Sequence, residues 1–220
     1  MILLVEGVDK AGKTPLIKLL CESGKDLGHS TVPMRVKQPP KTLAEPLKVM
    51  FDEIYQVWPQ SAGKLLIYDR FPVPSEMVYR PIVTKELDPK WHLMLAGWIK
   101  IATFFFQMYD VRIVYLDPPG HRERVNAEPD PYITPDMFDG LKSRYEIVLE
   151  LLERQGIPVF NVHDTWFDRE VADRILFEVT VEKERSYASA HSRVDASNLL
   201  PNRIRIPRRR REDSRPSGVV

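Results

Sequence analysis

Eight residues near the start of the chain have the spacing of a loop that binds phosphate. Residues 7–14 read Gly-Val-Asp-Lys-Ala-Gly-Lys-Thr, so four residues separate the two glycines and a Lys-Thr pair follows the second. Such a loop wraps an anion with successive backbone N–H groups, and the helix that follows adds the positive end of its dipole. The spacing predicts that Lys13 reaches the phosphates of a nucleotide and that the Thr14 hydroxyl binds Mg²⁺.

The segments on either side of this loop support the same interpretation. The apolar run 2–5 predicts a buried strand, and leucines spaced three and four residues apart over 13–27 predict an amphipathic helix. A strand–helix turn with an ordinary surface lysine is the alternative. We expect the phosphate donor, ATP, to contact the loop residues Gly7, Lys10, Ala11, Gly12, Lys13 and Thr14.

Two neighbouring residues, Asp69 and Arg70, follow a third apolar run and complete the parts that phosphoryl transfer needs. The reaction requires two phosphates held in line and their charge neutralised. Asp69 is the expected second carboxylate near the metal, with a capping aspartate as the alternative. Arg70 can bind the acceptor's phosphate through two N–H groups, with a surface salt bridge as the alternative.

Arg122 and Arg124 lie in a polar, proline-rich segment over 117–134. We expect this segment to be a lid loop that closes over the phosphates, with both arginines catalytic, stabilising charge in the transition state. A solvated loop is the alternative. Arg35, at the end of the expected second strand, is a weaker candidate for binding the acceptor's phosphate.

Several aromatic residues fall on the expected acceptor side, and one of them is expected to stack on the acceptor's base. They are Phe51, Tyr55, Phe71, Tyr79 and Trp91. Each of them taken alone is more often explained by core packing. We name Phe51 and Tyr79 as substrate-binding candidates. None of the five histidines has the spacing of a metal site, and a relay between His163 and Asp164 lacks a suitable nucleophile.

The periodicity of apolar residues alternates between strands and helices along the chain. We expect strands over 2–6, 31–36, 65–69, 111–116 and 157–162, and helices over 13–27, 42–58, 75–80, 89–108, 135–155 and 168–184. Pro33 favours an edge position for the second strand. The alternation predicts an α/β fold, a three-layer P-loop NTPase sandwich with a five-stranded parallel sheet and helices on both faces. Ligands of such sheets lie beyond the carboxyl ends of the strands.

The composition is that of a globular protein with a basic end. The chain has 220 residues with 43% hydrophobic and 29% charged residues and a single cysteine, Cys21, which suits a reducing cytoplasm. Residues 203–220 hold seven arginines and two acidic residues. We expect a kinase domain over 1–185, a disordered basic tail over 186–220, no membrane span and a cytoplasmic location.

Three stretches, taken together, resemble the thymidylate kinase family of nucleoside monophosphate kinases. They are residues 6–14, then Asp-Arg-Phe at 69–71 followed by Ser75 and Tyr79, and Val-Tyr-Leu-Asp-Pro at 114–118. Similar short chains occur among phage-encoded deoxynucleotide kinases. The resemblance covers roughly residues 1–180 in the order of its parts, and its specificity rests on the first two stretches.

This resemblance implies roles for individual residues. Asp9 would lie near the acceptor nucleotide and act with the catalytic residues, and Lys10 would assist catalysis beside it. Arg70 would bind the acceptor's phosphate, and the lid would carry Arg122 and Arg124. Members of the family use ATP and Mg²⁺ and are commonly homodimers, for which the apolar helix 89–108 could supply the interface or could equally be an intramolecular core.

The chain departs from the family's pattern where that pattern holds thymine. Residues 35–40 replace an Arg-Glu-Pro-Gly-Gly run, an Asn-Arg-Trp run is missing from the second helix, and Arg80 stands where glutamine often occurs. The first hypothesis is therefore phosphoryl transfer to a deoxynucleoside monophosphate, dTMP or a modified pyrimidine nucleotide. The alternatives are a kinase of a hydroxyl, on a nucleoside or on a modified base in DNA, with Asp69 or Asp9 as the base, and a nucleotide-gated binding module. DNA contact through the arginine-rich tail is an additional hypothesis.

Overall fold

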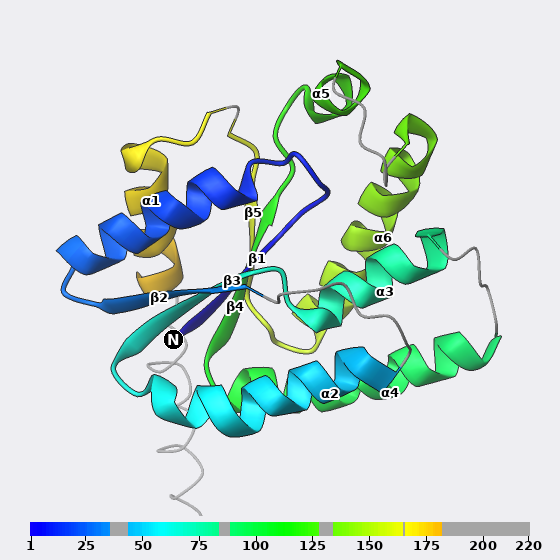
Figure 1. Ribbon diagram of the computed structural model, residues 1–220, viewed down its shortest axis with the longest axis horizontal. Coiled ribbons are helices and arrows are strands. Elements are labelled where there is room, and N and C mark those ends of the chain that lie inside the picture. Colours follow the sequence, from blue (N-terminus) through cyan, green and yellow to red (C-terminus); the bar gives the residue numbers. More distant parts are fainter. Residues whose placement is uncertain (36–43, 84–88, 128–133, 165, 182–220) are drawn as a thin grey trace, which may run out of the picture. The chain divides into compact units, whose positions relative to one another are not determined.

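Five parallel strands form one sheet in the order β2-β3-β1-β4-β5 in this computed structural model (Figure 1). The structure describes residues 1–35, 44–83, 89–127, 134–164 and 166–181. The strands are β1 (Ile2–Glu6), β2 (Ser30–Arg35), β3 (Lys64–Asp69), β4 (Val111–Leu116) and β5 (Val159–Val162). The register pairs Val5 with Asp69 and Glu6 with Tyr115, so the carboxyl ends of the three central strands lie at one edge.

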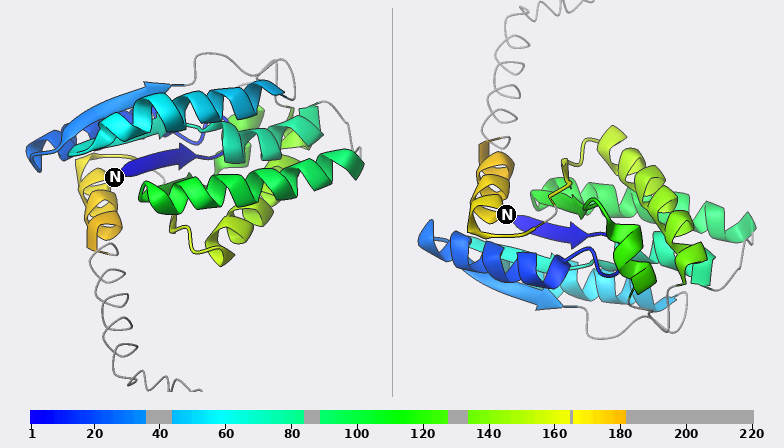
Figure 2. Two further views of the ribbon diagram at one scale, coloured as in Figure 1. Left: turned by 90° about the horizontal axis from the view of Figure 1, so that it is seen from below. Right: turned by 90° about the horizontal axis from the view of Figure 1, so that it is seen from above.

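Helices cover both faces of this sheet (Figures 1 and 2). The helix α1 (Lys13–Asp26) and a helix over 169–181 pack on one face. On the other face lie α2 (Ala44–Asp52), α3 (Pro72–Val83), α4 (Pro89–Met108) and α6 (Pro135–Arg154). The short α5 (His121–Ala127) lies beyond the end of β4. The chain divides into two units, Met1–Thr180 and Val181–Val220, and the sheet belongs to the first.

The side chains of β1 point alternately to the two faces of the sheet, which explains why two hydrophobic cores form. Ile2 and Leu4 point into the core under α4 and α6, whereas Leu3 and Val5 point into the core under α1, and all four are fully buried. A strand buried on both faces must be apolar throughout, as a central parallel strand is. The five expected strands and the expected edge position of β2 are confirmed.

The expectation that the third helix begins at Ser75 and stops before Pro81 was wrong. The helix α3 begins at Pro72, with a kink at Val73, and continues through Pro81 to Val83. Proline has no N–H to donate to the carbonyl four residues earlier, which here belongs to Met77. Arg144 of α6 donates to that carbonyl instead, at 3.4 Å from Nε and 3.3 Å from Nη2, so the helix tolerates the proline.

Two further expected segments also differ in detail. The second helix changes after Asp52 to a π-helical turn over Glu53–Val57 and then to a 3₁₀ turn over Trp58–Ser61. The expected helix start at Thr42 lies outside the described residues. The lid segment over 117–134 is a loop only in part, because α5 forms within it. None of the described helices combines the length and the hydrophobicity that crossing a bilayer requires.

Candidate active site

The loop over residues 7–14 connects β1 to α1 and has glycines at the two positions that admit no side chain. Gly7 has φ 145°, and a Cβ atom there would lie 2.8 Å from the carbonyl oxygen of Leu116. Gly12 has φ 91°, and its Cβ would lie 2.4 Å from the ring of Phe167. Both positions therefore require glycine, because of backbone conformation and because of neighbouring atoms.

Lys13 lies over this loop rather than in solvent. Its Nζ donates to the carbonyls of Gly7 and Val8, at 3.0 Å each, and the residue is only 8% exposed. Burial, aided by the charge of Arg70, lowers the pKa of the Lys13 ammonium to about 8, although nearby carboxylates oppose this. The positive charge of Lys13 is therefore only partly neutralised by its surroundings, so a bound phosphate would stabilise it.

Thr14, in the first turn of α1, meets Asp69, the last residue of β3. The Thr14 hydroxyl donates to Oδ2 of Asp69 at 3.4 Å, so the two predicted metal ligands are brought together. Among the described residues no group of three or more His, Cys, Asp or Glu side chains could hold a metal. A hydroxyl beside one carboxylate nevertheless fits Mg²⁺, which takes its remaining ligands from water and phosphate oxygens.

Three predicted acceptor-site residues, Asp9, Arg70 and Tyr79, form one cluster beside the loop. Arg70 has φ 66°, and its Nη2 donates to Oδ1 of Asp9 and, at 2.8 Å, to the Tyr79 hydroxyl. The Tyr79 hydroxyl donates to Oδ2 of Asp9 at 3.2 Å, and the guanidinium lies 4.5 Å from the centre of the Tyr79 ring. The three side chains therefore hold one another at the loop.

Glu6 is an essential part of this arrangement that the sequence reasoning did not assign a role. It is fully buried, and its carboxylate accepts from the Phe71 amide at 2.8 Å, the Ser75 hydroxyl at 2.8 Å and the Tyr145 hydroxyl at 3.0 Å. Burial raises the pKa of Glu6, and these donors oppose that shift. Ser75 therefore binds Glu6 instead of capping a helix. The sequence did carry a signal for this role, namely a charged residue at the end of an otherwise apolar strand.

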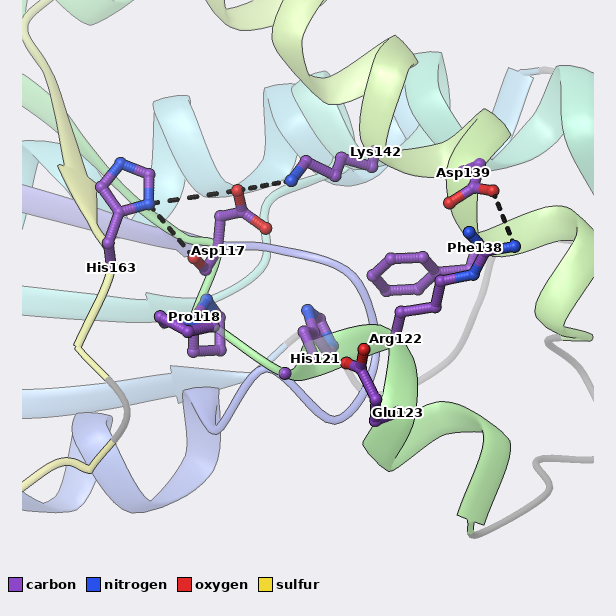
Figure 3. Close-up of a pocket in the computed structure, with 11 residues that line it drawn as sticks. Asp117, Pro118, His121, Arg122, Glu123, Phe138, Asp139, Lys142 and His163 are labelled. Atoms are coloured by element: carbon purple, nitrogen blue, oxygen red, sulfur yellow. Dashed lines mark hydrogen bonds and ion pairs between the residues drawn. The ribbon is translucent and has the colours of Figure 1, made fainter.

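The two predicted lid arginines take different positions on α5. Arg122 is exposed and pairs with Asp139 of α6 at 3.1 Å, so it does not reach the loop in this structure (Figure 3). Arg124 is half-buried, and its Nη2 is a buried atom with no hydrogen-bond partner among the described residues. A buried guanidinium nitrogen without an acceptor is costly and fits an anion.

A polar pocket of 390 Å³ opens between the end of β4, α5 and α6 (Figure 3). Asp117 at its edge accepts from Lys142 at 2.8 Å, and Nδ1 of His163 lies 3.1 Å from the Asp117 carbonyl oxygen. His163 thus contacts Asp117, whereas Asp164 pairs with Arg174. The pocket lies next to the loop, because His121 on its wall contacts the backbone of Asp9.

The remaining acceptor-site candidates are not part of the Asp9–Arg70–Tyr79 cluster, or their side chains lie outside the described part of the structure. Phe51 packs against the core below α4, with its ring stacked on Tyr55 at 5.9 Å and edge-on to Phe105 at 6.3 Å. The backbone of Arg35 pairs with Asp69 in the sheet, and its side chain is outside the described part of the structure, as is that of Trp91.

Comparisons with known proteins concern the fold. No family model and no curated protein matches the sequence. Among solved structures, polyphosphate kinase 2 from Arthrobacter aurescens TC1 matches with a TM-score of 0.58 and 16% identity, over 81% of this chain and 66% of that one. A putative polyphosphate kinase 2 from Pseudomonas aeruginosa PA01 matches with a TM-score of 0.55 and 19% identity, over 81% and 38%. The fold is that of a P-loop NTPase.

A third similar structure is matched over its whole length. Deoxyadenosine kinase from M. mycoides, with the products dCMP and a flexible dCDP bound, matches with a TM-score of 0.49 and 16% identity, over 83% of this chain and all of that one. At these identities the likeness concerns the fold. The sheet order and the two matches with TM-scores above 0.5 confirm the expected α/β P-loop architecture, and the chemistry must be argued from the site.

Proposed function

We propose that this protein is an ATP- and Mg²⁺-dependent phosphotransferase whose acceptor is a nucleoside monophosphate, dTMP or a modified pyrimidine deoxynucleotide. One observation carries the proposal above all. Lys13 on the loop, the Thr14–Asp69 pair and the Asp9–Arg70–Tyr79 cluster meet at a single edge of the sheet. That edge is where ligands of open α/β sheets bind.

The donor side of this site supports a nucleoside triphosphate. The loop amides and Lys13 would hold the β- and γ-phosphates, and the unpartnered Nη2 of Arg124 would approach them from α5. Thr14 and Asp69 would hold Mg²⁺, which neutralises charge on the phosphates when it is bound. The γ-phosphoryl group passes to an acceptor oxygen, and ADP leaves.

The acceptor side favours a phosphate over a hydroxyl. A hydroxyl acceptor needs a general base, whereas a phosphate monoester already carries a nucleophilic oxygen anion. Glu6 is unsuited to be that base, because it is buried and accepts from three donors. Both carboxylate oxygens of Asp9 already accept a hydrogen bond, one from Arg70 and one from the Tyr79 hydroxyl. The Arg70 guanidinium would bind a phosphate through Nε or Nη1, because its Nη2 already donates to Asp9 and to the Tyr79 hydroxyl.

The proposal is tested by incubating the purified protein with radiolabelled ATP, Mg²⁺ and a panel of acceptors. The panel holds dTMP, dUMP and its 5-substituted derivatives, thymidine, and DNA that contains 5-hydroxymethyluracil. We expect label on a monophosphate, with little on the hydroxyl acceptors, and loss of turnover in Lys13→Ala. Label on thymidine or DNA would instead establish the hydroxyl kinase, and folded protein that binds ATP without turnover on any acceptor would indicate a binding module.

We further propose that two chains associate through α4. Along this helix Ile101, Phe104 and Met108 are exposed at spacings of three and four residues, and Phe104 is 62% exposed.

The tail over 186–220, which lies outside the described residues, is proposed to contact nucleic acid through its arginines. A steep salt dependence of DNA binding that disappears when the tail is removed would support this contact.

A further inference from the structure

The carbonyl group of Asp9, in the middle of the phosphate-binding loop, is held by a residue from a distant part of the chain. Nε2 of His121, the first residue of α5, lies 2.6 Å from that oxygen. His121 is 3% exposed, and its ring packs edge-on against Phe138 of α6 with centres 4.8 Å apart. A buried ring braced in this way has little freedom to move, so the contact is a fixed part of the loop's surroundings.

This contact also determines which way the next amide points. A carbonyl oxygen only accepts, so Nε2 of His121 must carry the hydrogen. The peptide group is planar and trans, so the C=O of Asp9 and the N–H of Lys10 point in opposite directions. Holding the carbonyl toward His121 therefore turns the Lys10 N–H away from the His121 ring.

The backbone at Lys10 shows why the loop needs such a contact. Lys10 has φ 64°, a conformation that a residue with a side chain rarely adopts. Rotating the peptide between Asp9 and Lys10 by half a turn would bring this angle to about −116°, a negative φ of the kind that residues with a side chain usually adopt. The hydrogen bond from His121 opposes that rotation, which would turn the Lys10 N–H toward His121.

We propose that His121 is a positioning residue that holds the Asp9–Lys10 peptide with its N–H directed at the phosphates of the bound nucleotide. This inference rests on the proposed function in one respect, namely that the loop binds a nucleotide. The inference goes beyond the proposed function because it assigns the active conformation of the loop to a side chain of α5, 112 residues away along the chain. Burial lowers the pKa of His121, which keeps its ring neutral and its single hydrogen available to Nε2 at neutral pH.

The test compares variants at residue 121 by their affinity for ATP with Mg²⁺, measured by calorimetry. His121→Phe keeps a ring against Phe138 but removes the donor, whereas His121→Gln returns an N–H at a similar reach. Asn126→Ala, an exposed position on the same helix, is the control. We expect about tenfold weaker binding in H121F, most of it recovered in H121Q, and no change in the control.

Two further readouts separate positioning from a general structural role. In ¹H–¹⁵N spectra the Lys10 amide of the wild type should shift strongly when ADP binds, and in H121F it should not. In a Lys10→Gly background, glycine adopts either conformation freely, so we expect the cost of H121F to change from that in the wild type.

Equal ATP affinity in a folded H121F variant and the wild type would overturn this inference and leave the proposed function standing. No ATP binding by the folded wild type would overturn both. Should H121F not fold, His121→Gln and His121→Asn replace it, since they carry the same amide at different reach. Equal affinity in these two variants, or an unchanged Lys10 amide shift in His121→Asn, would refute the role.

Discussion

Replacing Lys13 by methionine should stabilise the ligand-free protein while abolishing nucleotide binding. The ammonium is buried, and its pKa falls from 10.5 to about 8, mainly because of burial. This difference corresponds to about 3 kcal/mol at 1.36 kcal/mol for each pH unit. The buried lysine therefore costs folding free energy, which the proposed phosphate ligand would return.

The net gain from this replacement is smaller than the full electrostatic cost. Lys13→Met also removes the hydrogen bonds to the Gly7 and Val8 carbonyls, each worth about 1 kcal/mol. We therefore expect the variant to be about 1 kcal/mol more stable than the wild type at pH 7. In a unit of this size that gain raises the melting temperature by about 2–4 °C.

The pH dependence gives this prediction its sharpest form. Between about pH 8 and pH 10.5 the unfolded chain binds the Lys13 proton and the folded protein does not, so wild-type stability rises with pH over this window. Relative to Lys13→Met, the wild type should gain about 2 kcal/mol between pH 8 and pH 9.5. Denaturant titrations of both proteins at pH 7, 8 and 9.5 measure this change.

Lys18→Met, at an exposed position of the same helix, is the matched control. It should show neither the stabilisation at pH 7 nor the change with pH. If the difference in unfolding free energy between wild type and Lys13→Met stays constant from pH 7 to 9.5, the assumed burial of the ammonium is incorrect. Lys13→Met that is clearly less stable than the wild type at pH 7 would contradict the reasoning equally.

Three more changes test separate parts of the site and surface. Asp69→Asn, with Thr14 retained, should lower apparent Mg²⁺ affinity about 10- to 100-fold in a magnesium titration of turnover, and an unchanged titration would remove Asp69 from the metal site. Tyr145→Phe should cost about 1.5–3 kcal/mol of unfolding free energy, because it takes a donor from the buried Glu6 carboxylate; wild-type stability would show that the bond contributes nothing. Phe104→Glu should turn a dimer into a monomer in sedimentation experiments, and a monomeric wild type would refute the interface.

The strands and the phosphate-binding loop could be predicted because their signals are local. Four consecutive apolar residues before Glu6 indicate a strand buried on both faces, and the glycine spacing follows from contacts that leave no room for a Cβ atom. The proximity of Thr14 and Asp69 also followed, since Thr14 begins the helix after β1 and Asp69 ends β3, the strand that pairs with β1. Only the order of elements was needed for these predictions.

The errors arose where a partner lies far away in the sequence. Pro81 predicts the end of a helix by every local rule, and the helix continues because Arg144 donates to the carbonyl that the proline cannot serve. The polar residues over 117–134 indicated a loop, whereas burial of His121 and Val125, one helical turn apart, stabilises α5. Seven residues carry too weak a periodicity to reveal this.

The same limitation applies to the chemistry of the loop. Its sequence specifies which groups can bind phosphate, but the direction of each amide depends on what holds the carbonyl of the same peptide. At Asp9 that group is His121, and at Phe71 the amide itself is held by the buried Glu6. Both residues are polar groups whose burial costs free energy unless they are fully bonded. A site assembled in this way retains a stability cost at Lys13 and Glu6 because ligand binding and geometry require it, and Lys13→Met measures that cost directly.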